Sequence, residues 1–357
     1  MWRASCVVML SCALVEAAGG AVQNEDYASL TQRARGDYRA GRFAAAEPVL
    51  LEALRVIPDG NPGPRGDTLV ELGYVYVNKD ELAKAERVYV EALAIFKRLA
   101  NPAKTARVLR DLGTIYSLQR RDDEALRILD KALKLSTSGP GKNDALAAQV
   151  LNSFGVVYYR QRKAAKAEKA FLQAWQMVSS SPPAGFDMAE LLNNLGAVYH
   201  VKLEFRKAED FLKQAVKVTE TDFGVAHPEL SYSLAMLGVL YADTGRFRES
   251  EEYYRRALAI LDARRAEFET RIARLLHGLS MMYTMAGRKE EAEATLAEAA
   301  IIARRKIETH TDMATILENY SSVLKKKGKT QEAEELRVEA RRARVTAGLV
   351  IHAHSPF

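Results

Sequence analysis

The side chains in this 357-residue chain that are best suited to recognising another molecule are two asparagines, Asn152 and Asn193. An amide carries both a hydrogen-bond donor and an acceptor, so it can pair with the backbone of an extended peptide whatever the peptide's own side chains are. Arg110 and Arg160 could meet carboxylates, because a guanidinium forms two parallel hydrogen bonds with such a group. These residue types favour binding over catalysis.

Signatures of catalysis and of metal binding are missing from the sequence. Gly139-Pro140-Gly141-Lys142 lacks the earlier glycine of a phosphate-binding loop, and neither H-E-x-x-H nor G-x-S-x-G occurs. His352 and His354 form an H-x-H pair near the end of the chain, which we interpret as part of a loose end and not as a metal site. The sequence therefore predicts a protein that is not an enzyme and that uses no cofactor and no metal.

Composition excludes several further classes of protein. Lysine and arginine number 52 against 46 acidic residues, and this formal net charge of +6 is spread too evenly to indicate nucleic acid. The only two cysteines, Cys6 and Cys12, lie in the first dozen residues. A disulfide framework and a cysteine-ligated zinc site are therefore excluded from the rest of the chain.

Residues 1–21 have the order of a secretory signal peptide. Arg3 precedes an apolar run over 6–15, and small residues follow over 17–21. The run is too short to span about 30 Å of hydrocarbon, and no other run in the chain reaches membrane-spanning length. We expect cleavage after residue 17, 18 or 21 and export to a periplasm or the medium. A capping helix, an uncleaved anchor and a lipid anchor on Cys12 are the alternatives, although Met9-Leu10-Ser11 fits a lipoprotein signal poorly.

The remainder of the chain repeats itself with a period of about 41 residues. A pattern of leucine, a small residue and tyrosine recurs, as in LVELGYVY (69–76), LNNLGAVY (192–199) and LAMLGVLY (234–241). The small residue falls at positions 34, 73, 113, 155, 196, 238, 280 and 321. Apolar residues are spaced i, i+3, i+4, i+7 in the first half of each copy and i, i+4, i+7 in the second, which are helical spacings. Each copy is therefore predicted to be a helix–turn–helix hairpin.

This pattern resembles the tetratricopeptide repeat, and it covers about residues 27–342 in eight copies. The long period and the missing proline after the second helix are similar to the repeats of kinesin light chains, with residues 219–261 as the closest copy. The resemblance implies an all-α fold, a right-handed α-solenoid of about eight hairpins. Residues 343–357 would form a C-terminal cap and a flexible tail.

The resemblance also implies that the first helix of each hairpin lines a concave groove. The residues that we expect on this surface share inward positions just before or after the small residue. They are Tyr74, Arg110, Asn152, Tyr159, Arg160, Asn193, His200 and His277. The alternative for each of them is a solvated side chain without a ligand.

We therefore expect an exported, non-enzymatic scaffold that binds a peptide or protein segment, with acidic character in the partner because of the groove's basic side chains. One alternative is an enzyme or enzyme subunit with an unrecognised site in the groove. Another is binding of single-stranded nucleic acid, which needs a continuous basic track. Asp67, Glu190, Asp243 and Glu318 interrupt such a track.

Overall fold

The computed structural model describes residues 26–58, 60–79, 81–180, 183, 187–307 and 313–353. Within these ranges the chain forms eight antiparallel helical hairpins and no strand. The first helices are α2 (Tyr27–Arg39), α4 (Pro62–Asn78), α6 (Pro102–Leu118), α8 (Asp144–Arg160), α10 (Met188–Val201), α12 (Leu230–Asp243), α14 (Arg265–Met285) and α16 (Met313–Lys326). The second helices are α3 (Phe43–Val56), α5 (Leu82–Arg98), α7 (Asp122–Thr137), α9 (Ala164–Val178), α11 (Phe205–Phe223), α13 (Phe247–Asp262), α15 (Lys289–Lys306) and α17 (Thr330–Ala353). The predicted all-α solenoid of eight hairpins is confirmed.

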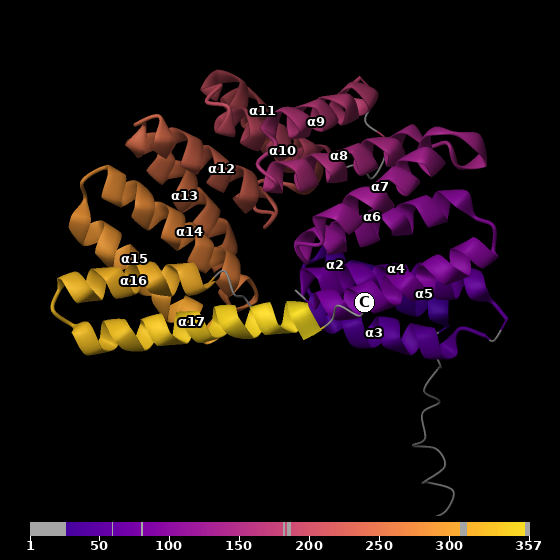
Figure 1. Ribbon diagram of the computed structural model, residues 1–357, viewed down its shortest axis with the longest axis horizontal. Helices are drawn as coiled ribbons and strands as arrows, with labels where there is room; N and C mark the ends of the chain where they lie inside the picture. The colour runs from indigo at the N-terminus through magenta and orange to yellow at the C-terminus, as the bar shows by residue number, and fades with distance from the viewer. Residues whose placement is uncertain are drawn as a thin grey trace, which may run out of the picture.

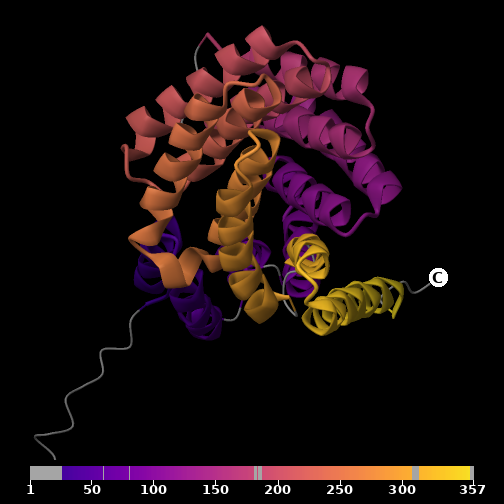
Figure 2. The same cartoon turned by 90° about the vertical axis from the view of Figure 1, so that its left-hand side faces the viewer.

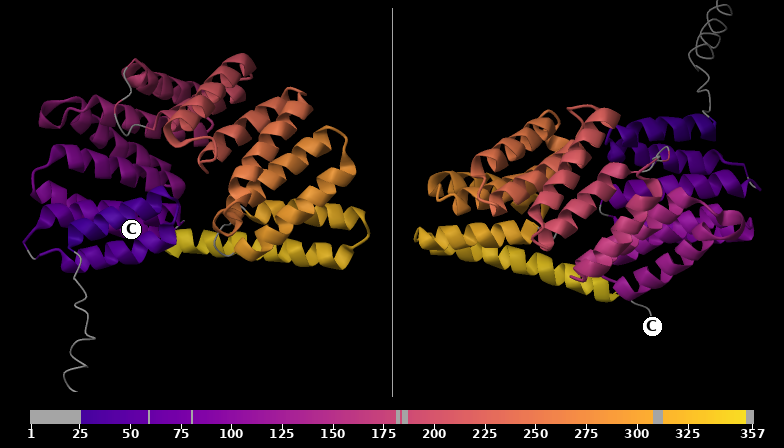
Figure 3. Two further views of the ribbon diagram at one scale, coloured as in Figure 1. Left: turned by 180° about the vertical axis from the view of Figure 1, so that it is seen from behind. Right: turned by 90° about the horizontal axis from the view of Figure 1, so that it is seen from above.

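The hairpins follow one another in an arc (Figure 1). Each hairpin packs on the next, and successive first helices also contact one another, as α6 does with α8 and α10 with α12. The first helices therefore line the inside of the arc. Views from the side and from above show that the two ends are displaced along its axis, so the chain forms a superhelical turn (Figures 2 and 3).

The small residue of each first helix lies against the second helix of its hairpin. A Cβ added at Gly73 would lie 2.6 Å from Cζ of Tyr89, and one added at Gly113 would lie 2.7 Å from Leu129. Where the second helix carries Ser250, its hydroxyl donates a 2.6 Å hydrogen bond to the Gly238 carbonyl. Close approach of the two backbones is thus the reason for the repeated small residue.

In the fully described hairpin turns, one residue adopts the left-handed conformation. In the sixth hairpin this residue is Gly245, with φ of 76°, and the following Arg246 N–H donates back to the Tyr241 carbonyl at 2.8 Å. The fifth hairpin has the same turn with Leu203, at φ of 62°. This conformation ends a helix while satisfying its last carbonyls, and it costs a leucine more than a glycine.

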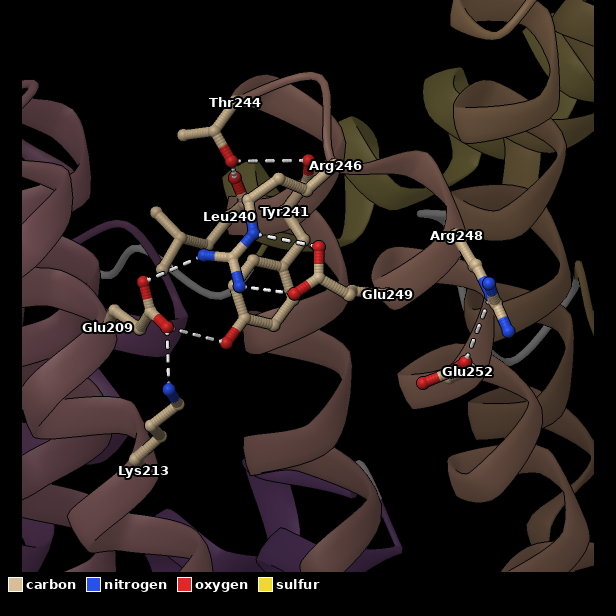
Figure 4. Close-up of polar contacts among 9 residues, drawn as sticks. All are labelled: Glu209, Lys213, Leu240, Tyr241, Thr244, Arg246, Arg248, Glu249 and Glu252. Carbon is tan, nitrogen blue, oxygen red and sulfur yellow. Dashed lines mark hydrogen bonds and ion pairs between the residues drawn. The ribbon is translucent and has the colours of Figure 1, made fainter.

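A polar clamp joins the sixth hairpin to the fifth (Figure 4). The guanidinium of Arg246 lies 4.1 Å from the centre of the Tyr241 ring and donates 3.0 and 2.8 Å hydrogen bonds to Glu209 and Glu249. Glu209, on the second helix of the preceding hairpin, also accepts from the Tyr241 hydroxyl at 2.8 Å and from Lys213 at 2.6 Å. A cation, a tyrosine ring and a carboxylate thus hold neighbouring repeats together.

The cation–carboxylate part of this clamp recurs along the superhelix with arginine or lysine as its cation, and in Arg121, Lys202 and Arg288 the cation also lies over a tyrosine ring. The cation–carboxylate pairs that link successive hairpins are Lys79–Glu47, Arg121–Glu86, Lys202–Glu168, Arg288–Glu251 and Lys327–Glu293. At the junction between the third and fourth hairpins the carboxylate position is occupied by Leu126, which packs in the apolar core there.

The first hairpin also contacts the start of the seventh hairpin. A Cβ added at Gly41, in the turn between α2 and α3, would lie 3.4 Å from the Arg264 guanidinium and 3.5 Å from the Phe268 ring. Arg264 directly precedes α14, and Phe268 lies within it. Hydrogen bonds from Arg264, with the charge of Arg42 added, lower the pKa of Glu267. The superhelix therefore closes on itself between its first and seventh hairpins (Figure 2).

The structure describes the chain up to residue 353 but leaves residues 1–25 outside the described range. The predicted signal peptide, residues 1–21, lies outside the described residues, and so do Cys6 and Cys12. At the other end, α17 continues to Ala353 where the sequence predicted a cap and loose tail from residue 343. Arg344 donates to Glu318 of α16 at 3.0 and 2.8 Å, which holds this added length against the last first helix. Among the described residues, no helix is both long and apolar enough to cross a membrane.

Candidate functional site

The site is built on the inner surface of the first helices. The middle of this surface is organised by the start of α10, where Asp187 caps the helix by accepting a 2.8 Å hydrogen bond from the Glu190 N–H. This cap places both carboxylates on the exposed inner side of the fifth hairpin.

The two predicted asparagines lie at the seams between repeats, where they are largely buried. Asn152 is 7% exposed; its amide donates to Glu190 Oε1 at 3.0 Å and its oxygen accepts from Asn194 at 2.9 Å. Asn193 is 4% exposed and donates to the Ser233 hydroxyl at 2.9 Å. Its own oxygen is buried without a hydrogen-bond partner in the described part of the chain. In this conformation neither amide faces an open groove.

The predicted arginines are also engaged by neighbours. Arg110 donates to Gln149 of the next hairpin at 2.5 Å and to Asp111 at 2.9 Å. Burial alone would lower the pKa of Arg110, but the charge of Asp111 outweighs it and raises that pKa. Arg160 donates to the Ser117 hydroxyl at 3.2 Å, one repeat earlier. These contacts weaken the reason for expecting an acidic partner.

Both predicted histidines also reach a neighbouring repeat. His200 Nε2 lies 2.8 Å from Asp243 Oδ2 in the sixth hairpin. His277 Nε2 lies 2.8 Å from Asn319 Nδ2 in the eighth, and burial lowers the pKa of His277. Among the described residues, no group of three or more His, Cys, Asp or Glu side chains could hold a metal ion. The histidines therefore serve the packing of one repeat on the next.

The predicted tyrosines remain open. Tyr74 is 47% exposed and packs edge-on against the rings of Tyr38 and Phe43, at centroid distances of 5.4 and 6.2 Å. Tyr159 is half-buried on α8. Partial desolvation raises the pKa of both hydroxyls. These rings offer rigid contact area on two different repeats.

Tyr232 was not predicted from the sequence, and neither were Asp187, Glu190 and Glu229 as members of the site. Tyr232, near the start of α12, is 53% exposed, and burial raises its pKa with further contributions from Tyr159 and Glu190. Desolvation also raises the pKa of Tyr74, and the charges of Glu229 and Asp187 add to it. We call these residues, together with Tyr74 and Tyr159, the central region, because the charges of its carboxylates act on Tyr74 and Tyr232. The repeat alignment offered no signal for Tyr232, because it lies six residues before Gly238 and outside the aligned inward positions.

A separate hollow of about 410 Å³ lies at the N-terminal end of the superhelix. It is bounded by α2 and α4, with Tyr27, Arg35, Asp67 and Glu71 among its lining residues. Arg35 already pairs with Glu71 there. Only Tyr74 of the predicted site comes from a helix that borders this hollow, so the central region and the hollow are distinct features.

Comparison with family models identifies the class of protein. One tetratricopeptide repeat model matches residues 64–138, 118–178 and 187–263, and a second matches residues 272–310. The matches of the first model alone cover more than half of the chain. The chain therefore belongs to the tetratricopeptide repeat family, as its sequence pattern predicted.

Solved structures show the same fold at low sequence identity. The apo form of the quorum sensor NprR from B. thuringiensis matches with a TM-score of 0.64 and 11% identity, over 94% of this chain and 92% of that one. A Rap protein in complex with competence and sporulation factor matches with a TM-score of 0.63 and 15% identity, over 80% and 76%. BtubC from P. vanneervenii matches with a TM-score of 0.53 and 19% identity, over 62% and 90%. The search of curated proteins found no match.

Proposed function

We propose that this protein is an exported, non-enzymatic scaffold that binds an extended protein or peptide segment on the inner surface of its superhelix. The observation that carries the proposal is the central region, where Tyr74 and Tyr232 present half-exposed rings from distant repeats. Exposed aromatic rings inside a concave surface are the usual anchors of a binding site. The fold shared with a Rap protein solved in complex with a factor adds support, by analogy of fold alone.

Export is the second part of the proposal. It is supported by the order of charge, apolar run and small residues over 1–21. It is also supported by the absence of cysteine after residue 12, because an unpaired thiol is a liability in an oxidising compartment. The free energy of binding would come from the exposed tyrosine rings.

The binding role is tested by substituting the exposed rings. Partners are captured from the exporting cell with the full chain and identified by mass spectrometry, and capture is repeated with Tyr74→Ala plus Tyr232→Ala. Phe223→Ala is the matched control, since this ring is 59% exposed at the end of an outer helix. We expect the double variant to lose its partners while its helicity and melting temperature stay close to wild type. Equal capture by wild type and double variant would place binding elsewhere.

A further inference from the structure

Two carboxylates in the central region form no ion pair within the described part of the chain, although the charge of Arg110 acts on one of them, Glu190. Across the described ranges, neither Asp187 nor Glu190 has a lysine, arginine or histidine nitrogen within ion-pairing distance, although both side chains are exposed. Other carboxylates of the first helices are paired, as Glu71 is with Arg35 and Asp67 with Lys104. Desolvation raises the pKa of both groups. They are therefore reached by water but lie deep inside the superhelix, where an opposite charge stabilises them most.

The Glu190 carboxylate is held in one orientation by buried amides. Asn194 donates to Asn152 at 2.9 Å, and Asn152 donates to Glu190 Oε1 at 3.0 Å. Asn152 is more than nine-tenths buried, so this short chain of hydrogen bonds is part of the repeat interface. A carboxylate fixed in this way needs no reordering when it meets a cation.

Exposed tyrosine rings share the inner surface with these carboxylates: Tyr74 is 47% exposed and Tyr232 is 53% exposed. Tyr232 interacts electrostatically with Glu190 and Tyr159, and Tyr74 does so with Asp187 and Glu229. A tyrosine ring attracts an ammonium or guanidinium group placed over its face. Cations, carboxylates and tyrosines are combined in the same way in the outer clamps, where Arg246 lies over Tyr241 and pairs with Glu209. At Asp187 and Glu190 the central region has the carboxylates and the rings of such a clamp without an ion-paired cation, whereas Glu229 already pairs with Arg271 at 3.0 Å.

We propose that the central region binds a lysine or arginine side chain of the partner segment, and that the partner is therefore basic at the point where it crosses α10. This inference rests on the proposed function, because it assigns the chemistry of the segment that the superhelix binds. The cation would lie against Asp187 and Glu190, with the rings of Tyr159 and Tyr232 beside it. Charge complementarity makes this occupant more favourable than an acidic segment, which the two carboxylates would repel.

The proposal is tested with a displayed library of random 12-residue peptides sorted on the purified full chain. Three forms are compared: wild type, Glu190→Gln, and the matched control Glu252→Gln on the outer helix α13. Glu252 is largely exposed and lies 3.7 Å from Arg248, so its loss leaves the inner surface unchanged (Figure 4). Glutamine at 190 can still accept the hydrogen bond from Asn152, so the variant is expected to keep its fold. Tyr232→Ala serves as a second variant with an exposed, foldable substitution.

We expect wild type and Glu252→Gln to enrich lysine or arginine at one peptide position and Glu190→Gln to lose that enrichment. For the best peptide, measured by fluorescence anisotropy, replacing its basic residue with norleucine should weaken binding about tenfold or more, and Glu190→Gln and Tyr232→Ala should each weaken it similarly. Enrichment of neutral or acidic peptides would overturn this inference and leave the proposed function standing. Basic peptides that bind Glu190→Gln as well as wild type would also overturn it. Failure to enrich any peptide would count against the proposed function itself.

Discussion

The clamp around Glu251 allows a quantitative prediction for how the repeats are held together. Glu251, on α13, accepts hydrogen bonds from Tyr283 at 2.9 Å, from Arg288 at 2.5 Å and from Arg255 at 2.8 Å. Among the residues that the structure describes, the next residue, Glu252, pairs with Arg248 alone, at 3.7 Å. Glu251→Gln should therefore weaken the junction between the sixth and seventh hairpins, and Glu252→Gln should not.

The size of the effect follows from the protonation of Glu251. Burial by itself would raise the pKa of Glu251, but the hydrogen bonds from Arg288, Tyr283 and Arg255 outweigh burial and lower that pKa to about 2 from 4.5. A shift of this size corresponds to about 3 kcal/mol at neutral pH. The side chain is 18% exposed at the rim of the superhelix, and screening by solvent reduces this to about 1 to 2 kcal/mol.

The pH dependence has a definite sign. Since the pKa of Glu251 is lower in the folded chain than in the unfolded chain, its stabilisation is fully present above about pH 4.5 and is lost as pH falls toward 2. The free energy of unfolding is measured by urea titration at several pH values. Amide hydrogen exchange in α13 to α15 is measured alongside, because a solenoid opens locally. Equal effects of Glu251→Gln and Glu252→Gln, or a difference that persists unchanged at pH 2, would refute the reasoning.

Three further predictions address packing, charge and export. Gly155→Ala should cost about 1 to 3 kcal/mol of unfolding free energy, because its Cβ would overlap the Phe171 ring. Gly36→Ala has open space around it and should gain about 0.5 to 1 kcal/mol. Urea titration of both variants checks this, and a loss of stability in Gly36→Ala would contradict it. Glu190→Gln should raise the urea midpoint at pH 7 and leave it unchanged near pH 3. The reason is that the folded-state pKa of Glu190 is raised, so its charge destabilises the fold only above its ordinary pKa. An unchanged midpoint at pH 7 would argue against an uncompensated charge at Glu190. N-terminal sequencing of chain recovered from the periplasm or medium should begin after residue 17, 18 or 21, and recovery there with an intact Met1 would disprove cleavage.

The hairpins themselves could be predicted from the sequence because their causes are local. Apolar residues at helical spacing define each helix, and a small residue at Gly73 or Gly155 is needed where the two helices of one hairpin meet. Both requirements involve residues fewer than 20 positions apart. The repetition of these local patterns was enough to identify the fold and the family.

The roles of polar residues could be predicted only in part. Glu251 lies in a clamp with Tyr283 and Arg288 of the next hairpin, a role for which the sequence pattern gave no sign. Asn152 and Asn193 were expected to face a ligand, but each is buried against the next repeat. Their partners lie about one period away, so the alignment that showed their equivalence could not show what they contact.

By itself, then, the sequence determined the period, the hairpins, the family and the presence of tyrosines on the first helices. The tertiary structure decided which of those side chains stay open. The stacking of successive repeats covers Asn193 and engages Arg110, while the curvature of the superhelix brings Tyr74 within the field of Glu229 from four hairpins further along. Curvature is the sum of small rotations at every junction, and no local pattern encodes that sum.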